Sequence, residues 1–175
     1  MIKKDNSEIF LTFIEKSVGV RLNGMRNLPA IRDWCRQTGL IDEFQQAKWL
    51  EKISIDPKIR MYSICRGDKV VGVCGLTDID HLNQRAEFSL YIFPKQQKQG
   101  YAKVALHLLL AHGFGELNLR TIWGETFVGN PAMKLFQAMG FQLEGRRRNF
   151  YFKNGRFLDA DLISMTREEF ENGCD

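Results

Sequence analysis

The sequence has few of the features that mark membrane, secreted or metal-binding proteins. It contains no run of about 18 apolar residues, so no membrane-spanning helix is predicted. Residues 1–5 include two lysines and an aspartate and are too polar for the start of a secretory signal. The four cysteines lie far apart without a Cys-x-x-Cys pair, which predicts neither a zinc site nor a disulfide framework. We therefore expect a cytoplasmic protein without a metal.

Two common phosphate-binding motifs are also missing. No Lys-Ser or Lys-Thr pair follows Gly100, which excludes the P-loop of ATPases. The Gly-x-Gly at Gly113–Gly115 lacks the third glycine of the dinucleotide-binding fingerprint and falls where a helix is expected to end. A phosphate-binding site in this chain would therefore need another design.

The overall composition fits one folded domain. At 175 residues, of which 44% are hydrophobic, the chain can build a full core, and we place a single domain at residues 1–175. The 25 basic and 21 acidic residues give a net charge of +4. Such a modest positive charge suits an anionic cofactor and does not require nucleic acid as a partner.

The most informative stretch runs from Ala86 to Leu117. It predicts a β-strand over Ala86–Ile92, a turn over Pro94–Gln99, and a long apolar helix that begins after Gly100. The N–H groups at the start of such a helix have no acceptor within it and lie at the positive end of its dipole. They predict an anion-binding site, and Gly100 and the small Ala102 would let the backbone approach a ligand closely.

Hydrophobic patterns in the rest of the chain predict further strands and helices. Of two apolar runs near the N-terminus, Ile9–Leu11 and Val18–Leu22, the second is the better strand candidate. An Asn-Gly pair within residues 150–157 predicts a tight hairpin. The remaining elements are expected as helices at 27–37, 42–57 and 131–139, hairpin strands at 60–65 and 70–76, and strands at 121–127 and 162–165. This order predicts a mixed α/β fold.

Two motifs in this order resemble the GNAT N-acetyltransferases. Gln97–Ala102 matches the family's Gln/Arg-x-x-Gly-x-Gly/Ala loop, which binds the pyrophosphate of acetyl-coenzyme A. A second motif consists of the strand Ile122–Glu125, the helix start Asn130–Ala132 and the helix end Met139–Phe141. The resemblance covers nearly the whole chain. It implies one GNAT domain of the α/β class, with a central, mixed, mostly antiparallel and splayed sheet that has helices on both faces.

Within the family, the chain is similar to the branch that acetylates ribosomal-protein N-termini and to the related amino-sugar N-acetyltransferases. The hairpin at residues 144–155 and the closing residues 166–170 are typical of these proteins. The acceptor is then a protein or peptide N-terminus or a small-molecule amine, with an amino-sugar nucleotide as an alternative. Residues 23–56 and the final hairpin are expected to select it, and the protein to be a monomer or homodimer.

The resemblance also implies acetyl-coenzyme A as co-substrate and a reaction without a covalent enzyme intermediate. In this family, backbone groups freed by the splay of the central strand bind the pantetheine arm and the carbonyl oxygen. The residues assigned to the cofactor in this way are Tyr91, Ile92 and Phe93 at the splay, Gln97, Lys98, Gln99, Gly100, Tyr101 and Ala102 in the loop, and Asn130 and Phe136 near the last motif.

Acetylation of an amine with a pKa near 8 to 10 requires a proton acceptor. The candidates are Glu87 and Glu125, acting directly or through water, and we favour Glu125 because it lies nearer the splayed end and aligns with the glutamate used by relatives. Relatives usually carry a tyrosine that protonates the departing thiolate, but this chain has Phe136 there. Tyr91 or water would supply the proton, or the thiolate leaves unprotonated.

A competing interpretation rests on the basic run Arg146–Arg148 and the aromatic run Phe150–Phe152. Basic residues beside aromatic ones suit a nucleic-acid-binding or other non-catalytic module. An alternating hairpin with one buried face explains the aromatics equally well, and Asp159 and Asp161 follow on the return strand. We therefore expect acetyl transfer as the main function, while the arginines could hold an acidic substrate such as a nucleotide sugar.

Overall fold

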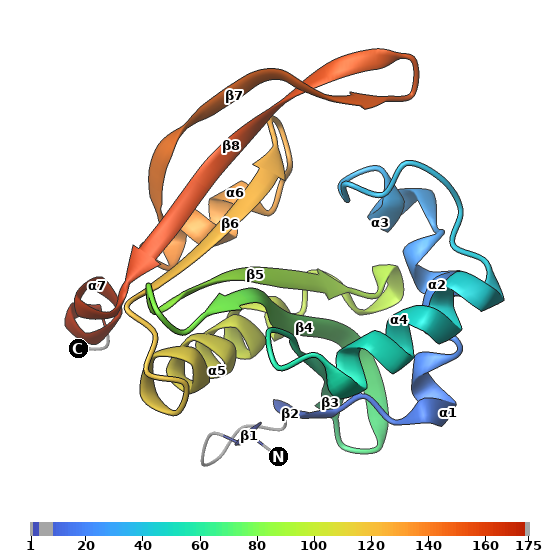
Figure 1. The fold of residues 1–175 in the computed structure, drawn as a ribbon, viewed down its shortest axis with the longest axis horizontal. Helices are drawn as coiled ribbons and strands as arrows, with labels where there is room; N and C mark the ends of the chain where they lie inside the picture. The colour runs from blue at the N-terminus through green and yellow to red at the C-terminus, as the bar shows by residue number, and fades with distance from the viewer. Residues whose placement is uncertain (1, 4–8, 174–175) are drawn as a thin grey trace.

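An eight-stranded sheet runs through the residues that the structure describes, 2–3 and 9–173 (Figure 1). The structure is a computed structural model. The strand order is β1-β2-β3-β4-β5-β6-β8-β7, and all neighbours are antiparallel except β5 and β6. The strands are β1 (Ile2–Lys3), β2 (Ile9–Phe13), β3 (Arg60–Arg66), β4 (Lys69–Asp80), β5 (Arg85–Ile92), β6 (Thr121–Phe127), β7 (Gln142–Lys153) and β8 (Arg156–Thr166). The predicted mixed, mostly antiparallel sheet is confirmed.

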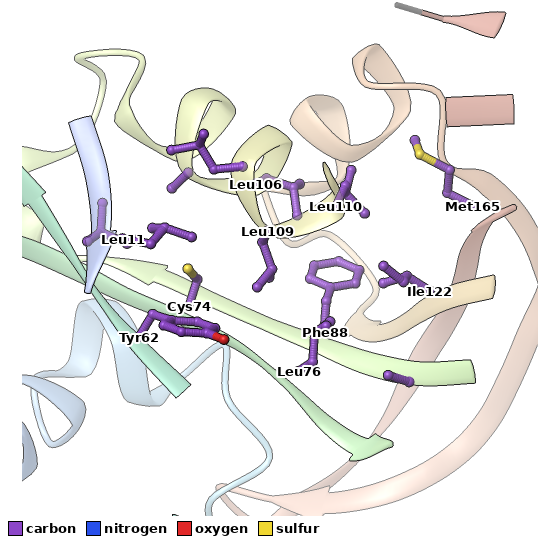
Figure 2. Close-up of a cluster of buried hydrophobic side chains, with 14 of the residues drawn as sticks. Leu11, Tyr62, Cys74, Leu76, Phe88, Leu106, Leu109, Leu110, Ile122 and Met165 are labelled. Atoms are coloured by element: carbon purple, nitrogen blue, oxygen red, sulfur yellow. The ribbon is translucent and has the colours of Figure 1, made fainter. Parts of the chain in front are cut away.

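Helices cover both faces of this sheet, as predicted. On one face, Leu106 and Leu109 of α5 lie in the same buried cluster as Leu76 and Phe88 of the strands (Figure 2). On the other face, α1, α2 and α4 cover a second cluster that includes Val73. The helices are α1 (Lys16–Gly19), α2 (Leu22–Arg26), α3 (Pro29–Arg32), α4 (Glu43–Ile55), the 3-10 turn η1 (Pro94–Gln96), α5 (Tyr101–Gly115), α6 (Met133–Ala138) and α7 (Arg167–Asn172).

Local sequence signals account for several of these boundaries. Asp42 caps α4 by accepting a hydrogen bond from the Gln45 amide at 2.7 Å, and the Gln45 side chain accepts one from the Asp42 amide. Asn154 and Gly155 both have positive φ, at 51° and 76°, which is the conformation that a tight hairpin between right-twisted strands requires. Both predicted hairpins, β3–β4 and β7–β8, are confirmed.

The central strands β5 and β6 separate after a short parallel contact. Their register consists of Arg85 with Thr121, Ala86 with Ile122, and Glu87 with Trp123. Both strands continue past this point, to Ile92 and Phe127. The splay is thus present, and Glu87 lies where the pairing ends.

Two predictions about the N-terminal third are wrong. Val18–Leu22 is not a strand: it spans the end of α1 and the start of α2, whereas the other run, Ile9–Leu11, lies in β2 (Ile9–Phe13). A short apolar run cannot by itself distinguish a strand from a buried helical turn. Here tertiary packing decides, because Gly19 lies so close to Leu50 of α4 that an added Cβ would come within 2.3 Å of its side chain.

The helix predicted over residues 27–37 ends early, at Arg32. The carbonyl groups of Arg32, Cys35 and Gln37 accept hydrogen bonds from the ammonium group of Lys153, at 2.5, 2.5 and 3.0 Å. A side chain from β7 therefore binds carbonyl oxygens that a continuing helix would use internally.

Of the helices in residues 2–3 and 9–173, none is long and apolar enough to cross a membrane. Within the same residues, no group of three His, Cys, Asp or Glu side chains is placed to hold a metal ion. Cys35, Cys65 and Cys74 are free thiols, and burial raises the pKa of Cys74. Cys174 lies outside the described residues.

Candidate active site

The loop before α5 has the backbone shape that the sequence predicts. Gly100 is the N-cap of α5 and has a left-handed φ of +80°, and Lys98 has a φ of +62°. A Cβ added at Gly100 would meet no described atom within 4 Å, so the loop faces open space. The first amides of α5 have no acceptor inside the helix and lie at its positive end. This geometry suits a phosphate group.

The polar side chains of the loop mostly stabilise the loop itself. The Gln97 amide nitrogen donates to the Ile92 carbonyl at 3.0 Å, which ties the loop to the end of β5. The Tyr101 hydroxyl donates to Gln99 and accepts from Arg66, both at 2.7 Å. These contacts leave the backbone N–H groups as the part of the loop that faces a ligand.

A cleft of about 510 Å³ joins this loop to the splay between β5 and β6. Phe93 and Gln99 lie outside its lining, and Phe93 packs beside Tyr91 with ring centroids 6.3 Å apart. The other residues assigned to the cofactor all line it: Tyr91, Ile92, Gln97, Lys98, Gly100, Tyr101, Ala102, Asn130 and Phe136.

The cleft passes from one side of the sheet to the other. On the α5 face it is lined by Ala102 and Phe136, together with Leu90. On the opposite face it is lined by Trp34 and Cys35, which follow α3. A long cofactor held at the α5 N-terminus can therefore reach through the splay toward a second substrate beside α3.

Both candidate carboxylates lie on the α3 side of the splay and share one arginine. Arg36 donates to Glu87 at 2.6 Å and lies 3.6 Å from Glu125. Glu125 also contacts the Arg147 guanidinium at 3.2 Å and accepts a hydrogen bond from the Tyr151 hydroxyl at 2.9 Å. Neither carboxylate lines the cleft itself. Arg36, which contacts both, directly follows the lining residues Trp34 and Cys35 in the sequence.

The environments of the two carboxylates differ. Burial raises the pKa of Glu87 above its ordinary value, and its contact with Arg36 opposes this only in part. Glu125 is surrounded by three donors, Arg36, Arg147 and Tyr151, which all stabilise a negative charge. The raised pKa makes Glu87 a candidate for the base, in contrast to our preference from the sequence.

The side chains available to protonate the thiolate also differ from the usual arrangement. Phe136 lines the cleft and packs edge-on against Phe88, with ring centroids 5.1 Å apart, but it has no acidic proton. Asn130 uses its side chain locally: it donates to Thr126 and accepts from the Ala132 amide. Tyr91 lines the cleft and carries a protonated hydroxyl group, although burial raises its pKa and so makes it a weaker acid than an exposed tyrosine.

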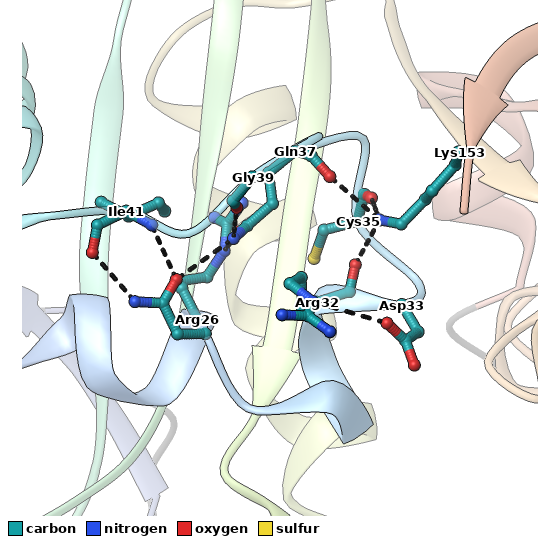
Figure 3. A network of polar contacts seen from close by, with 9 residues as sticks. Arg26, Arg32, Asp33, Cys35, Gln37, Gly39, Ile41 and Lys153 are labelled. Atoms are coloured by element: carbon teal, nitrogen blue, oxygen red, sulfur yellow. Dashed lines mark hydrogen bonds and ion pairs between the residues drawn. The ribbon is translucent and has the colours of Figure 1, made fainter. Parts of the chain in front are cut away.

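Lys153 connects the β7–β8 hairpin to the segment after α3 (Figure 3). The hairpin extends beyond the rest of the sheet, and its tip lies near α3 (Figure 1). Lys153 is buried, and this burial lowers the pKa of its ammonium group, while three carbonyl oxygens stabilise the charged form. The hairpin and the α3 segment thus form one wall beside the carboxylates.

Sequence reasoning missed Arg36 and Lys153 as parts of the site, and it did not predict that Arg147 and Tyr151 contact Glu125. The run Arg146–Arg148 was visible as a basic patch, but the structure divides it. Arg146 forms a two-point ion pair with Asp161 at 2.7 and 3.1 Å, while Arg147 pairs with Glu125. Strand alternation was the available signal, because it places neighbouring arginines on opposite faces. This run therefore does not form a continuous basic surface for nucleic acid.

Comparison with known proteins agrees with this geometry. Residues 28–162, well over half of the chain, match the family model described as an acetyltransferase (GNAT) domain. An N-acetyltransferase of Bacillus licheniformis, p20, is 29% identical over 148 residues, which cover 81% of this chain and 83% of that protein. Spermidine N(1)-acetyltransferase of Escherichia coli K12 is 34% identical over 107 residues, covering 61% of this chain and 57% of that enzyme.

The fold has a close counterpart among solved structures. The spermidine N-acetyltransferase of Vibrio cholerae, in a complex with CoA and spermine, superposes with a TM-score of 0.90 at 24% identity and covers 95% of this chain and 100% of that one. At this identity the likeness establishes the fold alone. The family is shown by the domain match: the chain belongs to the GNAT acetyltransferases and is an enzyme that transfers the acetyl group of acetyl-coenzyme A to an amine.

Proposed function

We propose that acetyl-coenzyme A occupies the cleft from the α5 face and that a primary amine meets it from the α3 face. The observation that carries this proposal is the cleft itself, which joins the Gly100 loop to the splay and continues to Trp34 and Cys35. The pyrophosphate would bind the N–H groups at the start of α5. The pantetheine arm would run along Tyr91 and Ile92, and the thioester would lie between β5 and β6.

The reaction would then be a direct transfer. The amine nitrogen attacks the thioester carbon, the new C–N bond forms, and the C–S bond breaks as the thiolate leaves. Glu87 accepts the proton that the amine loses, either directly or through water, because burial raises its pKa. Tyr91 or water donates a proton to the thiolate. Arg36 holds Glu87 in place and balances its charge, and it also contacts Glu125.

For the acceptor, we propose a small molecule with a primary amine. The support is the likeness to enzymes named for spermidine, together with the wall that Lys153 forms between the hairpin and α3. A protein N-terminus or an amino sugar, as expected from the resemblance to those branches, would have to enter past the same wall. The wall would therefore hinder a protein N-terminus more than a small amine or an amino sugar.

The test combines binding and turnover. Coenzyme A should raise the melting temperature, by a stabilisation of about 2.7 kcal/mol at a hundredfold excess over Kd. Release of free thiol from acetyl-coenzyme A should then be measured with amino acids, amino sugars, spermidine and short peptides as acceptors. We expect turnover with at least one small amine. An unchanged melting temperature at millimolar coenzyme A, or acetylation of peptides alone, would refute the proposal.

A further inference from the structure

The four charges at the splay are arranged so that only the positive ones face solvent. The side chains of Glu87 and Glu125 are 5% and 1% exposed, whereas those of Arg36 and Arg147 are 45% and 38% exposed. The sum of the four charges is zero, yet a molecule that approaches from the α3 side meets two guanidinium groups. The carboxylates lie behind them.

The two guanidiniums are also held in fixed positions. Arg36 is anchored by both carboxylates, and Arg147 is anchored by Glu125 and stacks over the Phe150 ring at 4.7 Å. A guanidinium has five N–H donors in a rigid plane. The contacts with the carboxylates use only some of these donors, so others remain on the exposed side. Two oriented arginines with exposed N–H groups are suited to bind a carboxylate or a phosphate in a two-point manner.

We propose that the acceptor carries an anionic group, a carboxylate or a phosphate, close to its amine, and that Arg36 and Arg147 bind this group. The inference rests on the proposed function, because it assumes that the amine enters from the α3 side. An anion on Arg36 and Arg147 would place a neighbouring amine beside Glu87. A polyamine has no anionic group and would gain no binding from these two arginines.

The experiment measures acceptor binding to the coenzyme A complex by calorimetry, so that it does not depend on turnover. Two matched pairs are compared: an amino acid with its carboxamide, and an amino-sugar phosphate with the unphosphorylated amino sugar. The first pair tests a carboxylate and the second a phosphate, and spermidine is the cationic comparison. Arg147→Gln is the test variant. Arg148→Gln is the matched control, because it removes the same charge one residue away on an exposed side chain.

We expect the anionic member of at least one pair to bind about tenfold more tightly than its neutral partner, and spermidine to bind most weakly. Arg147→Gln should abolish this preference and Arg148→Gln should keep it. Equal binding within both pairs, tighter binding of spermidine, no binding of any acceptor, or the same loss in both variants would overturn the inference. Turnover of the same acceptors, measured separately, reports on the proposed function: acetylation without anion preference refutes only the inference.

Discussion

The two sides of the cleft are built in different ways. On the proposed cofactor side, a continuous segment from Ile92 to Ala102 would supply most of the site through the backbone N–H groups at the start of α5. On the acceptor side, single side chains come together from the segment after α3, from β5, from β6 and from β7. Cofactor binding should therefore tolerate most side-chain changes, whereas acceptor use should respond to individual substitutions far apart in the sequence.

The largest effect is expected from a substitution at Gly100, on the cofactor side of the cleft. Gly100→Glu adds a side chain to a residue with a φ of +80° and places a negative charge where the pyrophosphate would bind. The thermal shift produced by coenzyme A should disappear. Gly115→Glu is the control, because it adds the same charge at the other end of α5, where a Cβ meets no described atom within 4 Å. A preserved shift in Gly100→Glu would mean that the phosphates bind elsewhere.

The next largest effect is expected from substitutions of the two carboxylates on the acceptor side. Glu87→Gln should lower kcat by about 10² to 10⁴ while coenzyme A still binds, and Glu125→Gln should cost less. The base must be deprotonated, so the wild-type rate should fall with decreasing pH at a higher pH than for a solvated glutamate, because burial raises the pKa of Glu87.

In Glu87→Gln this acidic limb should be absent, and the rate should rise as the pH approaches the pKa of the amine. Kinetic pH profiles of both variants decide the assignment. If Glu125→Gln shows the larger loss and removes the acidic limb, the base is Glu125, as the sequence suggested.

A smaller effect should follow from separating the hairpin from α3. Lys153→Met leaves three carbonyl groups without their ammonium donor, which should destabilise the fold by about 2 to 4 kcal/mol. The melting temperature should fall and the KM for the acceptor should rise, while the affinity for coenzyme A stays the same. Arg156→Met, an exposed position opposite Lys153 in the hairpin, is the control. Equal effects of both substitutions would argue against the proposal that Lys153 holds the hairpin against the segment after α3.

The smallest effect concerns the proton for the thiolate. Tyr91→Phe should lower kcat by less than about tenfold, because a thiol with a pKa near 8.5 is a good leaving group even when it is not protonated. Phe136→Tyr in the same protein should restore part of the loss, since Phe136 lines the same cleft. No recovery would assign the proton to water.

The cofactor side could be predicted from the sequence because its signals are local. The glycine before α5 and the apolar helix each fix the backbone within a few residues, as the Asn154–Gly155 turn does in the hairpin on the other side. On the acceptor side, the ion pair of Arg36 with Glu87 spans 51 residues and the contact of Lys153 with Cys35 spans 118. No local sequence pattern predicts contacts of this kind. The same contacts explain why the prediction for the segment after α3 was wrong. Lys153, which lies far along the chain, donates to carbonyl groups that a continued helix would use internally.

A crystal structure of the complex with coenzyme A tests the central claim most directly, namely that cofactor and acceptor meet from opposite faces of the splay. We predict the pyrophosphate at the N–H groups that follow Gly100 and the sulfur between β5 and β6 beside Tyr91, with Glu87, Arg36 and Arg147 left uncovered on the α3 side. Coenzyme A that covered these three side chains, or a sulfur that lay outside the splay, would contradict the account.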